Sequence, residues 1–211
     1  MSPTLFQEVL VWAVPVLVAV ILHEVAHGLV AYMLGDPTAK EAGRLTLNPL
    51  PHIDLFGTVL LPLFLVVVQS PFLFGYARPV PVNFHRLRHP RRDMVLVAAA
   101  GPVTNLLLAA AFAAALPLLW VPELRPAAQS LAAQIALRGV LINVVLAVFN
   151  LLPVPPLDGG RVLAGVVPLP VARLLARLEP YGMLIVVALL ATNVASVAMR
   201  PIIRVLLGWL L

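Results

Sequence analysis

The sequence contains no cysteine and few charged residues. Without a thiol the chain can form no disulfide, no thiolate metal site and no cysteine nucleophile, so any bound metal needs histidine and carboxylate ligands. Only 11% of the 211 residues are charged, whereas 62% are hydrophobic. A soluble domain carries about 25% charged residues. This scarcity excludes an ordinary soluble enzyme, a disordered chain and a basic domain that binds nucleic acid, and it indicates a multi-pass protein solvated by the lipid bilayer.

Long apolar runs divide the chain into predicted membrane helices. We predict an all-α multi-pass membrane protein with four to five transmembrane helices, a re-entrant segment and short membrane-associated strands. Residues 1–211 are predicted to form a single domain. The predicted helices cover residues 6–34, 94–119, 127–152 and 181–199. The tail, residues 200–211, is too short to span a membrane and is expected to lie in its interface.

The net charge of +5 has its meaning in where the basic residues lie. Residues 78–92 and 161–177 are rich in arginine and flank predicted membrane helices. Basic residues in short loops are concentrated on the cytoplasmic side of membrane proteins. We therefore predict that both segments face the cytoplasm.

One motif in the first predicted helix carries chemistry. His23-Glu24-Val25-Ala26-His27 has the HExxH pattern, in which two histidines four residues apart share one helix face and can bind one Zn²⁺. Glu24 lies beside them and can act as a general base toward water activated by the metal. Two histidines and a glutamate inside a membrane helix cost several kcal/mol unless they are paired or bound to a metal. The pattern therefore predicts a zinc site.

A catalytic zinc ion usually has a third protein ligand, for which Asp158 is the candidate. The other histidines and carboxylates that we considered lie in polar loops: His52, His85, His89, Glu41, Asp54 and Asp93. Asp158 instead follows a membrane helix, on a proline-rich segment that ends in Gly159 and Gly160. Irregular backbone at membrane depth is expected only where it lines a cavity. The alternative is a turn carboxylate at the membrane surface.

The apolar segment 55–74 decides whether Asp158 and the histidines can meet. If it crosses the membrane, the helix with the histidines and the helix before Asp158 are antiparallel, and the motifs lie at opposite ends. If it forms a re-entrant hairpin, the two helices are parallel and the motifs meet. We favour the re-entrant interpretation because Pro62 and Pro71 suit a broken segment.

Five segments together resemble a known family. HEVAHG, GRLTLNPLPHID, GYARPVPVN, AAAGPVTNLLLA and FNLLPVPPLDGGRVL are similar, in this order, to the site-2-protease type of intramembrane zinc metalloprotease. The closest resemblance is to compact bacterial and archaeal members without PDZ or CBS domains. It implies one Zn²⁺ per chain, with His23, His27 and Asp158 as ligands and Glu24 as the base.

The resemblance also suggests roles for two asparagines and two strands. Asn150 would orient substrate or stabilise the oxyanion, and the alternative is a capping or interhelical hydrogen bond. Asn105 is expected to pack or bond between helices, where Gly101 allows close approach. The substrate-binding edge strands would correspond to residues 44–48 and 76–83, although the apolar insert between them departs from many relatives.

The resulting expectation is hydrolysis of peptide bonds within or near transmembrane segments of other membrane proteins. The expected partners are a transmembrane protein substrate and the lipid bilayer, with no nucleic acid, and the site would face the cytoplasmic side of a prokaryotic cell membrane. Neither the substrate's identity nor an oligomeric state follows from the sequence. The alternatives are a membrane zinc carrier or sensor, which would need further intramembrane acids, and an inactive scaffold that binds helices.

Overall fold

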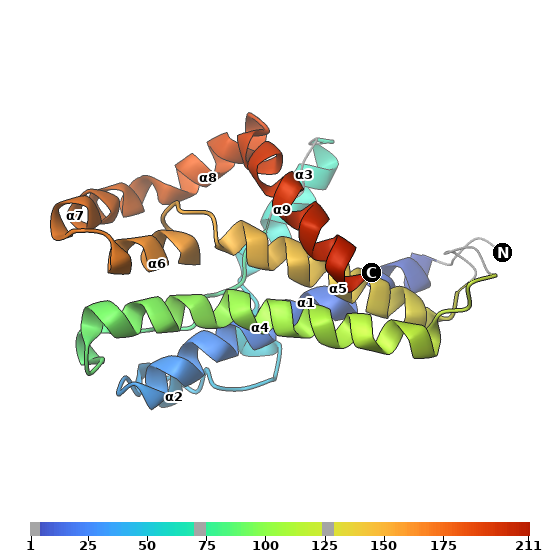
Figure 1. Cartoon of the computed structure of the whole chain (residues 1–211), viewed down its shortest axis with the longest axis horizontal. Coiled ribbons are helices and arrows are strands. Elements are labelled where there is room, and N and C mark those ends of the chain that lie inside the picture. The colour runs from blue at the N-terminus through green and yellow to red at the C-terminus, as the bar shows by residue number, and fades with distance from the viewer. Residues whose placement is uncertain (1–4, 70–74, 124–128) are drawn as a thin grey trace.

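The structure of the chain is a computed structural model that describes residues 5–69, 75–123 and 129–211 (Figure 1). Its α-helices are α1 (Leu5–Met33), α2 (Thr38–Glu41), α3 (Leu61–Val67), α4 (Pro90–Leu119), α5 (Leu131–Asn150), α6 (Asp158–Val166), α7 (Leu169–Leu178), α8 (Gly182–Ala191) and α9 (Val194–Leu210). Short π- and 3₁₀-helical segments are η1 (Leu50–His52), η2 (Leu55–Leu60), η3 (Phe84–Arg86) and η5 (Glu179–Tyr181). The predicted all-α class is confirmed.

Three long helices form the centre of the molecule. α4 packs against both α1 and α5, and these two also contact each other. α1 and α5 run in the same direction, with α4 antiparallel to them (Figure 1). Arg138, the charge that interrupts the apolar sequence of α5, lies with its guanidinium carbon 4.5 Å from the ring centroid of Trp12 on α1. The parallel arrangement brings the ends of α1 and α5 that carry the candidate site to the same end of the bundle.

Within the described residues, four segments are long and apolar enough to cross a membrane. They are Phe6–Met33, Pro90–Leu119, Leu131–Asn150 and Leu169–Ala191. η2 has 6 residues and α3 has 7. At 1.5 Å per residue the two extend about 20 Å, which is shorter than a hydrocarbon core of about 30 Å. Residues 55–67 thus form no fifth span by themselves, and the re-entrant path of the whole segment 55–74 stays a prediction. Residues 70–74 lie outside the described part of the chain.

The short strands expected at residues 44–48 and 76–83 are absent from the structure, because both segments, which lie wholly in its described part, have no regular secondary structure. This expectation was wrong for a reason that the sequence contains. Pro79 and Pro81 have no N–H, so the second segment cannot donate the hydrogen bonds of a regular ladder.

The prediction of one continuous helix over residues 181–199 was also wrong, because the structure has two helices there. α8 ends at Ala191, and Asn193 takes a left-handed conformation with φ of 62° before α9 begins. Asparagine tolerates this conformation better than most residues and can therefore end a helix. The tail that was expected in the membrane interface belongs to α9, which packs on α5.

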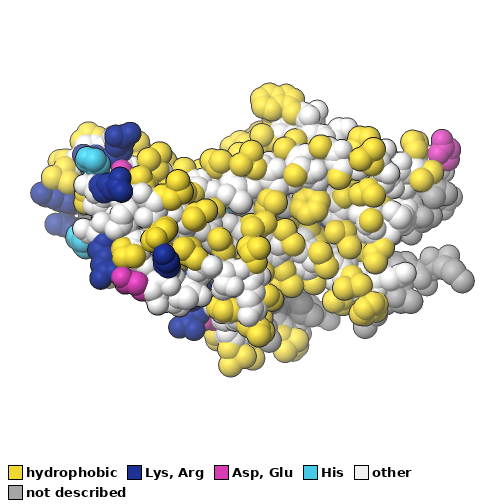
Figure 2. Space-filling model, turned by 90° about the horizontal axis from the view of Figure 1, so that it is seen from below, with side chains coloured by type: hydrophobic (Ala, Val, Ile, Leu, Met, Phe, Trp, Pro, Cys, Tyr) yellow, Lys and Arg dark blue, Asp and Glu magenta, His cyan; other side chains and the backbone are white. Residues whose placement is uncertain are grey.

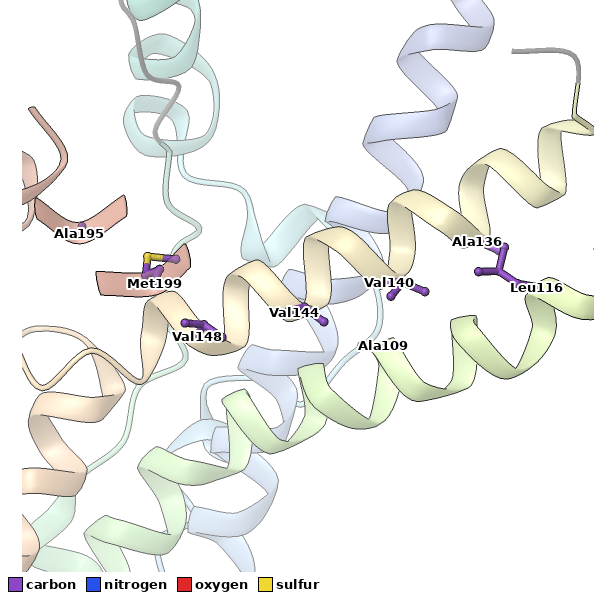
Figure 3. Packing of buried hydrophobic residues seen from close by; sticks show 8 residues of the cluster. All are labelled: Ala109, Leu116, Ala136, Val140, Val144, Val148, Ala195 and Met199. Carbon is purple, nitrogen blue, oxygen red and sulfur yellow. The ribbon is translucent and has the colours of Figure 1, made fainter. Parts of the chain in front are cut away.

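The main apolar cluster lies between α4, α5 and α9. Along α5, Val140, Val144 and Val148 repeat every four residues, so they share one face of the helix. They pack with Ala109 and Leu116 of α4, Ala136 of α5, and Ala195 and Met199 of α9 (Figure 3). The small side chains let the helices approach closely, which is how helices associate within a membrane.

Charge is concentrated at one end of the molecule. Lys and Arg side chains gather at the end that holds α2 and α7, whereas hydrophobic side chains cover much of the rest of the face that Figure 2 shows. Ten of the 14 basic residues lie in the segments 35–93 and 153–180, which include α2, α6 and α7. The distribution is that of a membrane protein with one basic face.

Gly139 tests the close packing of α4 and α5. A Cβ at Gly139 would lie 2.5 Å from Cδ2 of Phe112, so we expect Gly139→Ala to lower the free energy of unfolding by about 1–3 kcal/mol. Gly208→Ala is the matched control, because a Cβ there meets nothing within 4 Å. Thermal denaturation in detergent compares the two variants, and equal stability would contradict the packing described here.

Candidate metal centre

Three side chains from two helices converge on one point. His23 and His27 come from α1, and Asp158 is the first residue of α6. The two Nε2 atoms are 3.0 Å apart, and they lie 3.2 Å and 3.3 Å from Oδ2 of Asp158. All three residues are at least 91% buried, since their exposed fractions are 7%, 9% and 7%. Within the described ranges, no other group of three or more His, Asp or Glu is placed to hold a metal ion.

The opposite ring nitrogens fix the tautomers of both histidines. Nδ1 of His23 is 2.6 Å from Oδ1 of Asn105, and Nδ1 of His27 is 2.7 Å from the carbonyl oxygen of Val97. Both partners are oxygens that only accept, so each Nδ1 carries the hydrogen and donates it. Each Nε2 of a neutral imidazole is then left with a lone pair that points at the other imidazole and at the carboxylate of Asp158.

This arrangement fits a zinc ion. Three lone pairs face one another in a buried space, and Oδ2 of Asp158 has no hydrogen-bond partner. A proton can bridge one pair of these atoms, whereas a metal cation can bind all three. Ligands about 2.0–2.1 Å from a tetrahedral zinc lie about 3.3–3.4 Å apart, close to the distances found here. Two imidazoles and a carboxylate are also a ligand set that catalytic zinc sites use.

Glu24 lies beside this group and faces a cavity. Its Oε2 accepts a hydrogen bond of 2.7 Å from the backbone N–H of Val80. Glu24 and all three converging residues line a cavity of about 470 Å³. The rest of its wall includes apolar side chains such as Val20, Leu146, Phe149, Met183 and Val186. An acid that can move protons, a potential metal site and an apolar cleft thus meet at one place.

Comparison with known proteins supports a peptidase. The model of peptidase family M50 matches residues 118–192. "Putative zinc metalloprotease YwhC" of Bacillus subtilis is 40% identical over 193 residues, which cover 90% of this chain and 84% of that protein. The chain belongs to peptidase family M50. The resemblance to site-2 proteases seen in the motifs is thereby confirmed.

Two further relatives are longer than this M50 peptidase. "Putative zinc metalloprotease Rip2" of Mycolicibacterium smegmatis is 34% identical over 176 residues, covering 83% of this chain and 64% of that protein. The Rip2 protein of Mycobacterium tuberculosis (H37Rv) is 36% identical over 143 residues, covering 68% and 52%. The chain therefore spans less than two thirds of either Rip2 protein. No solved structure matches it at a significant level.

Glycines make room for the site of the M50 peptidase. A Cβ at Gly101 on α4 would lie 2.4 Å from Nε2 of His27 and 2.5 Å from Cε1 of His23, so the helix backbone itself forms one wall of the metal centre. A Cβ at Gly159 would lie 2.2 Å from the carbonyl oxygen of Leu151, which shows how tightly α6 turns back against the end of α5. The close approach expected at Gly101 is present.

Two buried asparagines support His23. Asn105 donates from Nδ2 to Oδ1 of Asn143 (2.8 Å), and Asn143 donates from its own Nδ2 to the carbonyl of Gly139 (2.8 Å). Both asparagines are fully buried. The bond to Gly139 fixes the orientation of the Asn143 amide, so that its oxygen faces Asn105. Because the Asn105 Nδ2 donates to that oxygen, the Asn105 oxygen faces His23. The sequence predicted an interhelical role for Asn105 but did not reveal Asn143, whose signal was a polar residue within an apolar helix.

Asn150 lies in the cavity wall, but no hydrogen bond joins it to His23, His27 or Asp158, all of which are described in the structure. Its Nδ2 donates a 3.0 Å hydrogen bond to the carbonyl of Leu146, one turn earlier in α5. The local hydrogen bond is thus present, while a contact with substrate stays a prediction. Of the two segments expected to bind substrate, the segment 76–83 lines the cavity, and residues 44–48 do not.

Replacing Asn105 should weaken metal binding. Asn105→Leu removes the acceptor of the His23 Nδ1–H and frees the ring to rotate, so we expect zinc affinity to fall about 10- to 100-fold. Chelator competition on purified, folded protein measures this. Asn150→Leu is the control, because its amide bonds only its own helix and zinc affinity should stay unchanged. Equal zinc affinity in Asn105→Leu and wild-type protein would show that the hydrogen bond does not orient the ligand.

Proposed function

We propose that the chain is a zinc metalloprotease that hydrolyses peptide bonds within or near the transmembrane segments of membrane proteins. The observation that carries the proposal is the convergence of three lone pairs beside Glu24, inside a bundle of apolar helices. Family membership supplies the peptidase class. The active unit is a single domain over residues 1–211, because α9 packs on α5, the helix that precedes Asp158.

In this proposal His23, His27 and Asp158 hold the zinc ion, which supplies Lewis-acid chemistry and makes water acidic enough to act as a nucleophile near neutral pH. Glu24 takes a proton from the attacking water and later gives it to the leaving amine. Asn150 lines the cavity, and among the described residues only one hydrogen bond from its Nδ2 is found, so in this proposal its second N–H donates to a substrate carbonyl.

The size of the cavity limits how the substrate enters. A helix about 10 Å wide occupies about 420 Å³ per turn of 5.4 Å, so a cavity of about 470 Å³ holds roughly one turn's length of chain. A transmembrane helix hides its carbonyls in its own hydrogen bonds, and only a locally unwound stretch exposes them. We therefore expect the enzyme to cleave substrates whose apolar segment contains helix-breaking residues.

The basic end of the molecule supports a site on the cytoplasmic side of the cell membrane. Asp158 begins α6, and α6 packs on α7 at the end where the lysine and arginine side chains gather (Figures 1 and 2). Basic loops remain on the cytoplasmic side during membrane insertion. Water would then reach Glu24 from the cytoplasm.

Two substitutions separate metal binding from catalysis. Glu24→Gln should keep zinc but lower cleavage by at least about 10²–10⁴-fold, because the proton acceptor is lost. Asp158→Ala should lose zinc together with activity, because one of three ligands is gone. The assay uses zinc analysis and a quenched fluorescent synthetic peptide with one apolar span that contains a Gly-Pro pair. Cleavage by Glu24→Gln, or zinc transport across proteoliposomes without cleavage, would contradict the proposal.

The absence of native cysteine makes orientation directly measurable. Lys40→Cys places one exposed thiol on α2, and Pro122→Cys places one at the opposite end, between α4 and α5. With intact cells, a membrane-impermeant maleimide should label Pro122→Cys and leave Lys40→Cys unlabelled until the cells are permeabilised. The reverse pattern would place the site on the other side of the membrane.

A further inference from the structure

A single backbone amide holds the carboxylate of Glu24. In the sequence Pro79-Val80-Pro81, Val80 is the only residue with an N–H, because proline has none. This N–H donates to Oε2 of Glu24 at 2.7 Å, across 56 residues of chain. No hydrogen bond to the other carboxylate oxygen, Oε1, is found among the described residues.

The packing of Val80 on α1 brings the amide within reach. Val80 is 7% exposed, and a Cβ at Gly28 would lie 2.8 Å from its Cγ1. Gly28 is four residues after Glu24, so the two share a face of α1. The absence of a side chain at Gly28 therefore lets the segment lie directly on the face from which Glu24 projects.

Other backbone bonds hold the segment on both sides of Val80. Before it, the N–H of Arg78 donates to the carbonyl of His52 at 2.9 Å. After it, the N–H of Asn83 donates to Oδ2 of the buried Asp36 at 2.6 Å. The donor that faces Glu24 is thus part of a fixed wall of the cavity.

We propose that the Val80 N–H is a positioning group for the general base. It binds one oxygen of Glu24 and fixes the side-chain torsions, so that the second oxygen is the one that exchanges protons with water. The flanking prolines serve this role, because they leave no neighbouring N–H to compete for the carboxylate. This inference rests on the proposed role of Glu24 in peptide hydrolysis. It assigns a role to Val80, whose N–H acts through Glu24 and binds neither the metal nor the substrate.

Hydrogen exchange tests the contact without any activity measurement. The amide of Val80 should exchange slowly in the wild-type protein and at least about 10-fold faster in Glu24→Ala, which removes the acceptor. The amide of Asn83, bonded to Asp36, is the control within the same segment and should not change. Equal exchange at Val80 in both proteins would overturn the inference.

Kinetics test what the contact does. Val80→Pro removes the N–H, and kcat should fall about 10- to 100-fold with zinc content and KM nearly unchanged, since a misplaced base slows chemistry rather than binding. Val80→Ala keeps the N–H and shortens the side chain, so it measures how much of the loss comes from packing. If the two variants lose equal kcat, or if KM alone changes, the N–H does not position the base.

Val80→Pro could also slow the enzyme by disturbing the cavity wall as a whole, and a double variant distinguishes this effect from loss of the N–H. In Glu24→Asp the shorter carboxylate no longer reaches the amide, so adding Val80→Pro should cost little further kcat. Full additivity would overturn the inference. The peptide and the Glu24→Gln variant described above keep the two ideas apart: cleavage by Glu24→Gln refutes the proposed function, whereas a normal kcat in Val80→Pro, with Glu24→Gln inactive, refutes only the role of Val80.

Discussion

The main physical constraint on this structure is a set of three lone pairs that face, and repel, one another in a buried space. The Nε2 atoms of His23 and His27 and Oδ2 of Asp158 lie 3.0–3.3 Å apart, and all three residues are buried. In such surroundings, unpaired polar atoms cost several kcal/mol. A zinc ion held at their centre would turn this cost into binding energy, and metal binding would then be coupled to folding of this end of the bundle.

The helices around this centre hold it in place by two devices. Glycine brings backbone close: Gly101 lets α4 pack directly on the imidazoles, and Gly28 lets the cavity wall pack on α1. Buried amide side chains then orient the metal-binding ring, because Asn143 orients Asn105 and Asn105 orients His23. Helices in a membrane gain little from the hydrophobic effect between them, so close packing and hydrogen bonds provide their specificity.

The sequence predicted what local spacing determines. HExxH places two histidines on one face of α1, and the proline- and glycine-rich segment indicated that Asp158 follows α5 on irregular backbone near membrane depth. Contacts made across the chain could not be foreseen. Asn143 is one polar residue in an apolar helix, and only the position of α4 reveals its partner. The break at Asn193 depends on a residue in the left-handed conformation, which hydrophobic periodicity does not register. The expected strands did not form because prolines have no N–H and because other hydrogen bonds occupy N–H groups such as that of Arg78.

X-ray absorption at the zinc edge of the purified protein shows whether His23, His27 and Asp158 hold a zinc ion. We expect one zinc ion per chain, with two imidazole nitrogens at about 2.0–2.1 Å and an oxygen shell of carboxylate and water. In Asp158→Ala the bound zinc should be lost or its oxygen shell altered. A first shell without two imidazoles, or an unchanged spectrum and zinc content in Asp158→Ala, would contradict this expectation.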